Sequence, residues 1–169
     1  MAKPFVAILM GSDSDLSMME MTISELKSLG ISIEAKVLSA HRSPEDTCDY
    51  VKHAEMRGCA VFIAAAGMAA HLAGNVAAHT IKPVIGVPID VGSLHGLDAL
   101  LSTVQMPGGV PVACVSIGEA GAKNAAILAA QILALTDANL TDQLKQQRVK
   151  KRDALKKADE ALQSKIRSK

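Results

Sequence analysis

Five short apolar runs, each followed by a stretch suited to a helix, constrain the fold of this chain more than any other feature. They cover residues 5–10, 32–38, 60–65, 83–87 and 111–116. All but the second are almost continuously apolar, which is typical of strands buried on both faces of a parallel sheet. The second alternates in part and is expected nearer an edge. Because segments of about 10–15 residues separate the runs, the order predicts right-handed βαβ units with helices on both faces of the sheet.

Helix boundary signals agree with this order. Gly30 and Gly58 stand where the first two helices are expected to end, since glycine readily adopts the left-handed conformation of a helix C-terminus. The hydroxyl of Ser43, followed by Pro44, predicts the N-terminus of the second helix. Further helices are predicted for residues 94–103, for residues 122–135 and, capped by Asp137, for the last segment.

Length and charge divide the chain into an α/β domain over residues 1–136 and a basic helical extension over residues 137–169. The 169 residues leave room for one ordinary domain. The net charge of +1 conceals ten basic against three acidic residues in 143–169, which leaves an acidic remainder. Leu155, Leu162 and Ile166 form a stripe too thin to hold a helix alone in water, so the extension is expected to pack on a partner surface.

Composition argues against several classes of protein. Aromatic residues make up 2% of the chain, so base stacking on protein rings is not a major binding device, and nucleic acid is a minor hypothesis despite the basic segment. The three scattered cysteines favour a reducing cytoplasm over a disulfide framework. We find no signal peptide, no run long enough to cross a membrane, no metal-ligand spacing and no nucleophile elbow.

Three polar clusters follow the first three apolar runs. They occupy residues 11–15 (GSDSD), 39–43 (SAHRS) and 66–74 (AGMAAHLAG). In open α/β sheets, ligands bind at the carboxyl ends of the strands, so the three clusters are expected to meet at one edge. The sequence therefore predicts a ligand site there.

The first cluster offers hydroxyls and backbone N–H groups at a helix N-terminus, which stabilises a phosphate. Asp15 could hold ribose hydroxyls. The alternative is that Ser12, Ser14 or Asp15 is only a helix N-cap.

The second and third clusters offer histidines. His41 stands beside Arg42, which suits a proton-transferring group next to an anion-binding guanidinium. The alternative is a loop histidine bonded to a backbone carbonyl. His71 is the only strongly polar side chain of a Gly- and Ala-rich cluster, and its alternative is a structural histidine.

The motifs that carry a family resemblance are GSDSD, SAHRSPE, AGMAAHLAG and STVQMPGGVPVACVSIGEAGAKNAAILAAQIL. Over about residues 5 to 142 the chain closely resembles the N5-carboxyaminoimidazole ribonucleotide mutase family of purine biosynthesis. The resemblance implies a flavodoxin-like, three-layer α/β/α fold with a C-terminal helical extension. It implies a cytoplasmic isomerase with no metal or organic cofactor and no nucleic-acid or membrane partner. It also implies a homo-octamer in which the C-terminal helix packs on a neighbouring subunit.

The family moves a carboxylate from the exocyclic nitrogen of an aminoimidazole ribonucleotide to a ring carbon. Carried over by motif, His41 is the expected general acid/base, and carbon dioxide is the expected intermediate in a closed pocket. The expected substrate-binding residues come from all three clusters: Ser12, Ser14, Asp15, Ser39, Ala40, Arg42, Gly67, Ala70, His71 and Leu72.

A related branch carboxylates the aminoimidazole ribonucleotide directly with carbon dioxide, and there SAHR tends to read SAHK and the AAHL histidine is replaced. Arg42 and His71 therefore favour the mutase branch. The chain departs from the family pattern at Met68, Ala73 and Asn75, and the missing proline at position 73 is expected to loosen the third loop. The alternatives are the direct carboxylase and a non-catalytic nucleotide-binding module.

Overall fold

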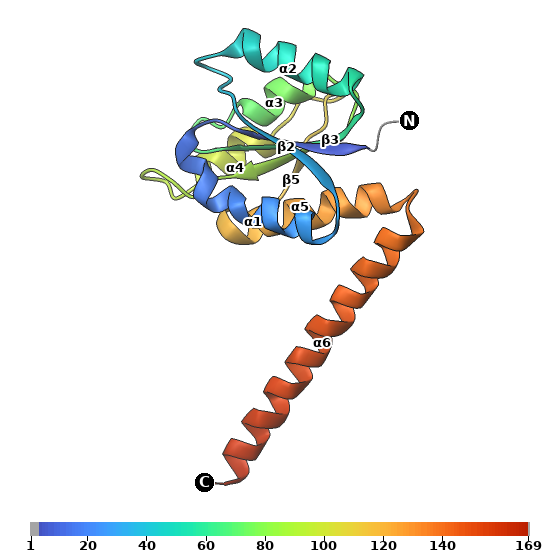
Figure 1. Ribbon diagram of the computed structural model, residues 1–169. Helices are drawn as coiled ribbons and strands as arrows, with labels where there is room; N and C mark the ends of the chain where they lie inside the picture. Colours follow the sequence, from blue (N-terminus) through green and yellow to red (C-terminus); the bar gives the residue numbers. More distant parts are fainter. Residues whose placement is uncertain (1–3, 169) are drawn as a thin grey trace. The chain divides into compact units, whose positions relative to one another are not determined.

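The computed structural model describes residues 4–168, and within them a parallel sheet alternates with helices (Figure 1). The sheet has the strand order β2-β1-β3-β4-β5, and all of its pairs are parallel. This is the flavodoxin-like order, in which the chain reverses direction across the sheet between β1 and β3. The strands are β1 (Phe5–Met10), β2 (Ser32–Val37), β3 (Cys59–Ala66), β4 (Val84–Pro88) and β5 (Ala113–Cys114).

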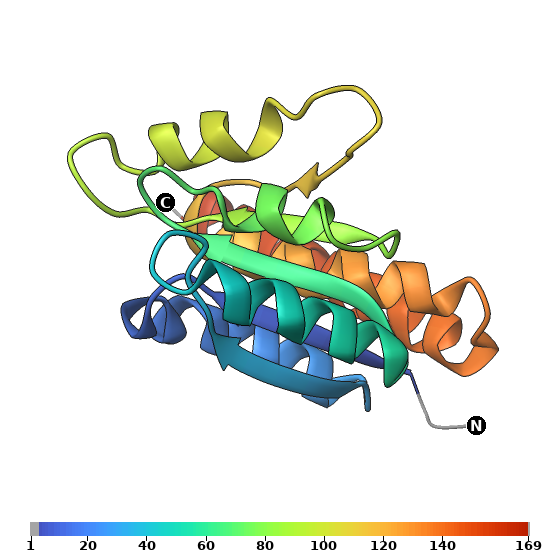
Figure 2. The same cartoon turned by 90° about the horizontal axis from the view of Figure 1, so that it is seen from above.

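Helices cover both faces of the sheet, which confirms the predicted three-layer α/β/α fold. Figure 1 shows α1 and α5 on one face and α2 and α3 on the other, and Figure 2 shows the same layers from above. A single 3-10 turn, η1 (Asp13–Asp15), precedes α1. The helices are α1 (Leu16–Ser28), α2 (Pro44–Met56), α3 (Leu72–Ala77), α4 (Leu97–Val104), α5 (Gly118–Ala134) and α6 (Ala138–Arg167).

The centre of the sheet forms the core. Every residue of β1 is buried, and the middle of β3 is buried around Phe62 and Ile63. Strand β2 lies at one edge and is largely exposed, as its partly alternating sequence predicts. Because the apolar central strands are fixed between two helical layers, the loops at their carboxyl ends have a rigid base.

The prediction of a buried fifth strand over residues 111–116 is wrong. Only Ala113 and Cys114 pair with β4, and neither is buried. Strand β5 lies at the open edge of the sheet and has one neighbour, and Pro111 lacks the N–H that would extend the ladder. An apolar run therefore does not by itself distinguish a central strand from an edge.

The C-terminal ends predicted for the first two helices are confirmed, whereas α4 and α5 begin at Leu97 and Gly118 and not at residues 94 and 122. Gly30 and Gly58 have positive φ angles of 70° and 97° directly after the first two helices. Pro44 is the first residue of α2 as expected, but Ser43 makes no side-chain cap. Its hydroxyl instead accepts a hydrogen bond from the N–H of Ser39, at 3.1 Å, and so closes the preceding loop on itself.

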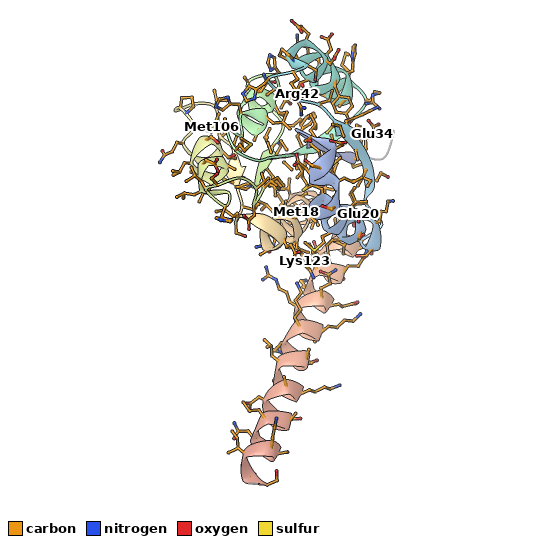
Figure 3. The ribbon with its side chains drawn as sticks, turned by 90° about the vertical axis from the view of Figure 1, so that its left-hand side faces the viewer. Met18, Glu20, Glu34, Arg42, Met106 and Lys123 are labelled. Atoms are coloured by element: carbon orange, nitrogen blue, oxygen red, sulfur yellow. The ribbon has the colours of Figure 1, made fainter. Side chains whose placement is uncertain are left out.

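The chain separates into two compact units, Met1–Ile132 and Leu133–Lys169. In the second unit Asp137 caps α6, because its carboxylate accepts from the N–H of Leu140 at 3.0 Å. Side chains project from all sides of α6 (Figure 3), and Leu155 and Leu162 are exposed. No helix between residues 4 and 168 is both long and apolar enough to span a bilayer.

Candidate active site

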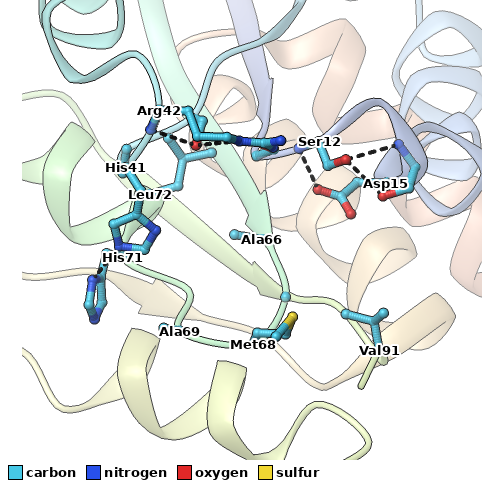
Figure 4. Close-up of a pocket in the computed structure, with 15 residues that line it drawn as sticks. Ser12, Asp15, His41, Arg42, Ala66, Met68, Ala69, His71, Leu72 and Val91 are labelled. Carbon is cyan, nitrogen blue, oxygen red and sulfur yellow. Dashed lines mark hydrogen bonds between the residues drawn. The ribbon is translucent and has the colours of Figure 1, made fainter. Parts of the chain in front are cut away.

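The loops that follow β1, β2 and β3 line one cavity of about 490 Å³. Ten of the eleven site residues predicted from sequence line it, so the strand-end argument placed the loops correctly. Those residues are Ser12, Ser14, Asp15, Ser39, Ala40, His41, Arg42, Gly67, His71 and Leu72. Figure 4 shows His41 and His71 together on one side and Ser12 and Asp15 on the other.

The first loop is held by its own side chains. The N–H of Ser12 donates to a carboxylate oxygen of Asp15 at 3.0 Å, and the hydroxyl of Ser14 donates to that of Ser12 at 2.9 Å. Ser12 is thus the N-cap of η1 in a capping box, as the structural alternative predicted, and it also lines the cavity. Burial raises the pKa of the Asp15 carboxyl above its ordinary value of 3.8, against the opposing effect of its hydrogen bonds.

Arg42 joins the second loop to the first. Its guanidinium donates to the carbonyl oxygen of Gly11 at 2.8 Å and to the hydroxyl of Ser39 at 3.4 Å. The side chain is exposed, and it extends from the side of the cavity that holds His41 toward Ser12 (Figure 4). Three further guanidinium N–H groups are not used by these two bonds, which leaves Arg42 able to donate to an anion in the cavity.

The two histidines contact one another directly. Nε2 of His41 lies 2.8 Å from Nδ1 of His71, and the rings meet edge to face with an interplanar angle of 77°. One of these nitrogens must donate and the other accept, so a single proton lies between the rings. His41 therefore differs from the alternative of a loop histidine bonded to a backbone carbonyl, and it forms half of an exposed imidazole pair at the cavity.

The third loop brings backbone close to the cavity. A Cβ built on Gly67 would lie 2.2 Å from Cγ1 of Val91, so no larger residue fits without moving Val91. Met68 has a φ of +56°, in the left-handed region that favours glycine. Position 68 is also one of the three at which the chain departs from the pattern of the family that it resembles.

Ala70 is the one predicted site residue that does not line the cavity. It is buried, with 2% of its surface exposed, and its N–H donates to the hydroxyl of Ser102 on α4 at 3.0 Å. The sequence reasoning treated residues 66–74 as one loop facing the ligand. The chain instead turns inward at Ala70 before α3 begins, because α4 offers a partner for its backbone.

Sequence reasoning missed five lining residues: Gly11, Ala66, Met68, Ala69 and Val91. Four of them are neighbours of predicted residues. Val91 comes from the loop after β4, and the strand-end rule that predicts the first three loops applies equally there.

Other reactive side chains lie outside the cavity. Burial raises the pKa of the Cys59 thiol to about 11, so this cysteine is protonated at neutral pH. Between residues 4 and 168, no three His, Cys, Asp or Glu side chains gather as a set of metal ligands.

Comparison with known proteins identifies the family. The AIR carboxylase family model matches residues 5–154. The chain is 56% identical to the N5-carboxyaminoimidazole ribonucleotide mutase of Saccharolobus solfataricus, over 84% of this chain and 89% of that one. It is 52% identical to the mutase of Bacillus subtilis, over 86% of this chain and 90% of that one. A crystal structure of Treponema denticola PurE superimposes with a TM-score of 0.86 and 33% identity, covering 95% of this chain and 99% of that one. The chain belongs to the AIR carboxylase family.

Proposed function

We propose that this protein is an isomerase that converts N5-carboxyaminoimidazole ribonucleotide to 4-carboxy-5-aminoimidazole ribonucleotide in purine biosynthesis. One observation carries the proposal. A contacting pair of imidazoles, His41 and His71, lines the same cavity as a helix N-terminus and an arginine. The name shared by the close relatives, which are more than half identical to the chain, supports this reaction.

The ribonucleotide binds with its ribose phosphate at the first loop. The hydroxyls of Ser12 and Ser14 line the cavity at the N-terminus of η1, where the positive end of the turn favours a phosphate. Arg42 adds a charge-assisted donor from the second loop. The Asp15 carboxylate, which accepts from the Ser12 N–H, also lines the cavity and is the acceptor for a ribose hydroxyl.

His41 moves the proton. The C–N bond of the substrate carbamate breaks and releases carbon dioxide, while the exocyclic nitrogen receives a proton. The ring carbon then attacks carbon dioxide to form the new C–C bond, and it gives up its own proton. His41 serves both transfers, so the reaction consumes no net proton, which is required of an isomerisation.

The wall of the cavity suits a small uncharged intermediate. Ala40, Ala66 and Ala69 line it together with Gly67, and none of these side chains carries a polar group. Carbon dioxide is lost as an intermediate if it diffuses away, so a wall that presents no competing nucleophile favours its recapture.

The experiment that tests this function offers the protein both substrates, with and without bicarbonate. We expect turnover of N5-carboxyaminoimidazole ribonucleotide at a rate independent of added bicarbonate. Turnover of the unmodified aminoimidazole ribonucleotide that rises with bicarbonate would instead indicate the direct carboxylase. Binding of either ribonucleotide without product would indicate a nucleotide-binding module. Arg42 and His71 both line the cavity, and by the resemblance they favour the mutase over the carboxylase.

The protein is also proposed to work as a cytoplasmic homo-octamer, with the extension packed on a neighbouring subunit. Large apolar side chains support this, because they are exposed at helical spacing on α4 (Leu97, Leu101 and Val104) and on α6 (Leu155 and Leu162).

Native mass spectrometry tests the proposed assembly. The double variant Leu155→Lys, Leu162→Lys should lower the oligomeric state, whereas Ser164→Lys, elsewhere on α6, should not. An unchanged octamer in the double variant would argue against the extension as an assembly element.

A further inference from the structure

The loop from Ala66 to Ala70 carries no side chain that can fix its conformation by a conventional hydrogen bond. Its five residues are Ala, Gly, Met, Ala and Ala. The next residue is His71, whose Nδ1 must lie within hydrogen-bond distance of His41. Something outside the loop must therefore set its path, since the loop has only backbone groups with which to be held.

Helix α4 supplies that support through Ser102. Its hydroxyl accepts from the Ala70 N–H at 3.0 Å and donates to the carbonyl of Asp98, one turn earlier, at 2.7 Å. The hydroxyl is thus oriented by its own helix with its lone pairs directed at the loop. Ser102 is half-buried and does not line the cavity, so it does not reach a bound ligand.

His71 is held from the other side by α3. It is the N-cap residue of that helix, and its carbonyl accepts from the Asn75 N–H at 2.9 Å. The backbone of His71 therefore lies between two anchors, one at the residue before it and one in the first turn of α3. With both anchors in place, the imidazole of His71 is presented to His41.

We propose that Ser102 is a positioning residue, which holds the third loop so that His71 pairs with His41 and keeps it oriented for proton transfer. This inference rests on the proposed function. Ser102 touches neither imidazole and acts through the Ala70 backbone. Thr103 cannot replace it, because the hydroxyl of Thr103 bonds Ala99 at 2.7 Å and lies 3.5 Å from the carbonyl of Ala70, not its N–H.

The test compares Ser102→Ala, which leaves the Ala70 N–H without this partner, with Ser102→Thr, which keeps a hydroxyl. Ser28→Ala is the matched control, because the Ser28 hydroxyl bonds only a carbonyl of its own helix, that of Glu25 at 2.8 Å. We expect Ser102→Ala to lower kcat by on the order of tenfold, since small displacements of a reacting group are costly. KM should stay within about twofold, because the first loop and Arg42 are untouched, and Ser102→Thr should restore most of kcat.

A double-mutant cycle separates positioning from a general loss of stability. If Ser102 acts through His71, adding Ser102→Ala to a His71→Asn variant should cause no further loss of kcat. If the double variant instead loses kcat by the product of the two single-variant factors, the inference is overturned. It is also overturned if Ser102→Ala alone keeps the kcat of the parent.

Imidazole ¹⁵N spectra of the labelled protein give a readout that does not need turnover. Ser102→Ala should shift the His41 and His71 signals, whereas Ser28→Ala should leave them unchanged. If the parent protein does not turn over N5-carboxyaminoimidazole ribonucleotide but these shifts occur, the positioning inference stands and the proposed function fails. Spectra unaffected by Ser102→Ala would overturn the positioning inference alone.

Discussion

The loops after β1 and β3 reach the same cavity but are held in different ways. The first loop is closed by its own side chains, with Ser12 bonded to Asp15 and to Ser14 within four residues of chain. The loop before His71 has no such groups and depends on a hydroxyl of α4, 32 residues further along the chain. The first loop is therefore a local structure, whereas the loop that presents His71 is held by tertiary packing. Changes at the two ends of the cavity should affect binding and chemistry separately.

The largest effect is expected at the imidazole end. His41→Asn keeps a polar side chain of similar size but cannot transfer a proton near neutral pH, so kcat should fall by about 10³-fold. Binding of the ribonucleotide, measured by calorimetry, should change little because the first loop is intact. His53→Asn is the control, since His53 is exposed on α2 and away from the cavity. Normal turnover by His41→Asn would contradict the role assigned to His41.

A smaller effect, of the opposite kind, is expected at the anion end. Arg42→Ala removes a charged donor, which is worth ~1.5–3 kcal/mol, so KM should rise by about 10- to 100-fold while kcat falls less. Steady-state kinetics measures both. Arg57→Ala is the matched control, because Arg57 pairs with Glu34 on the surface and does not line the cavity. If Arg42→Ala loses kcat at unchanged KM, Arg42 acts in the chemical step as the imidazoles do, and the proposed separation of binding from chemistry is wrong.

Two glycines sharpen the contrast in packing. Gly67→Ala would place a Cβ 2.2 Å from Cγ1 of Val91, whereas Gly11→Ala meets Cβ of Ala66 at 3.4 Å, an ordinary contact. Thermal and urea unfolding should show a loss of about 1–3 kcal/mol for Gly67→Ala and little change for Gly11→Ala. Equal losses would mean that both loops are packed equally tightly.

The smallest effect concerns the pH dependence of stability at Asp15. Burial raises the pKa of this carboxyl above 3.8, so folding favours its protonated form, and its ionisation lowers stability as the pH rises through the folded-state pKa. Asp15→Asn keeps an acceptor for the Ser12 N–H without that cost. Its Tm should exceed that of the parent by about 1–2 °C at neutral pH. The difference should vanish only at a pH well below 3.8, where the folded and unfolded carboxyls are both protonated. If the difference in Tm between Asp15→Asn and the parent grows as the pH falls, folding does not favour the protonated form of Asp15.

Much of the fold could be predicted because strong local signals coincide with it. The runs at 5–10 and 60–65 became buried parallel strands, and Gly30 and Gly58 ended helices as expected. The errors occurred where neighbours decide the outcome. Whether the run at 111–116 is central or at an edge depends on which strand lies beside it. The hydroxyl of Ser43 accepts from the N–H of Ser39 in the preceding loop and does not cap its own helix.

Sequence alone determined which strand-end loops form the site, because a parallel sheet brings the carboxyl ends of its strands to one edge. The family resemblance selected the residues within those loops, ten of which line the cavity, and it added their expected roles. Only the tertiary structure decided that His41 meets His71, that Ala70 turns away from the cavity and that Ser102 holds it there. Those contacts join residues about 30 positions apart, and their distances depend on how α4 and the loops pack against the sheet, which no local pattern of residues specifies.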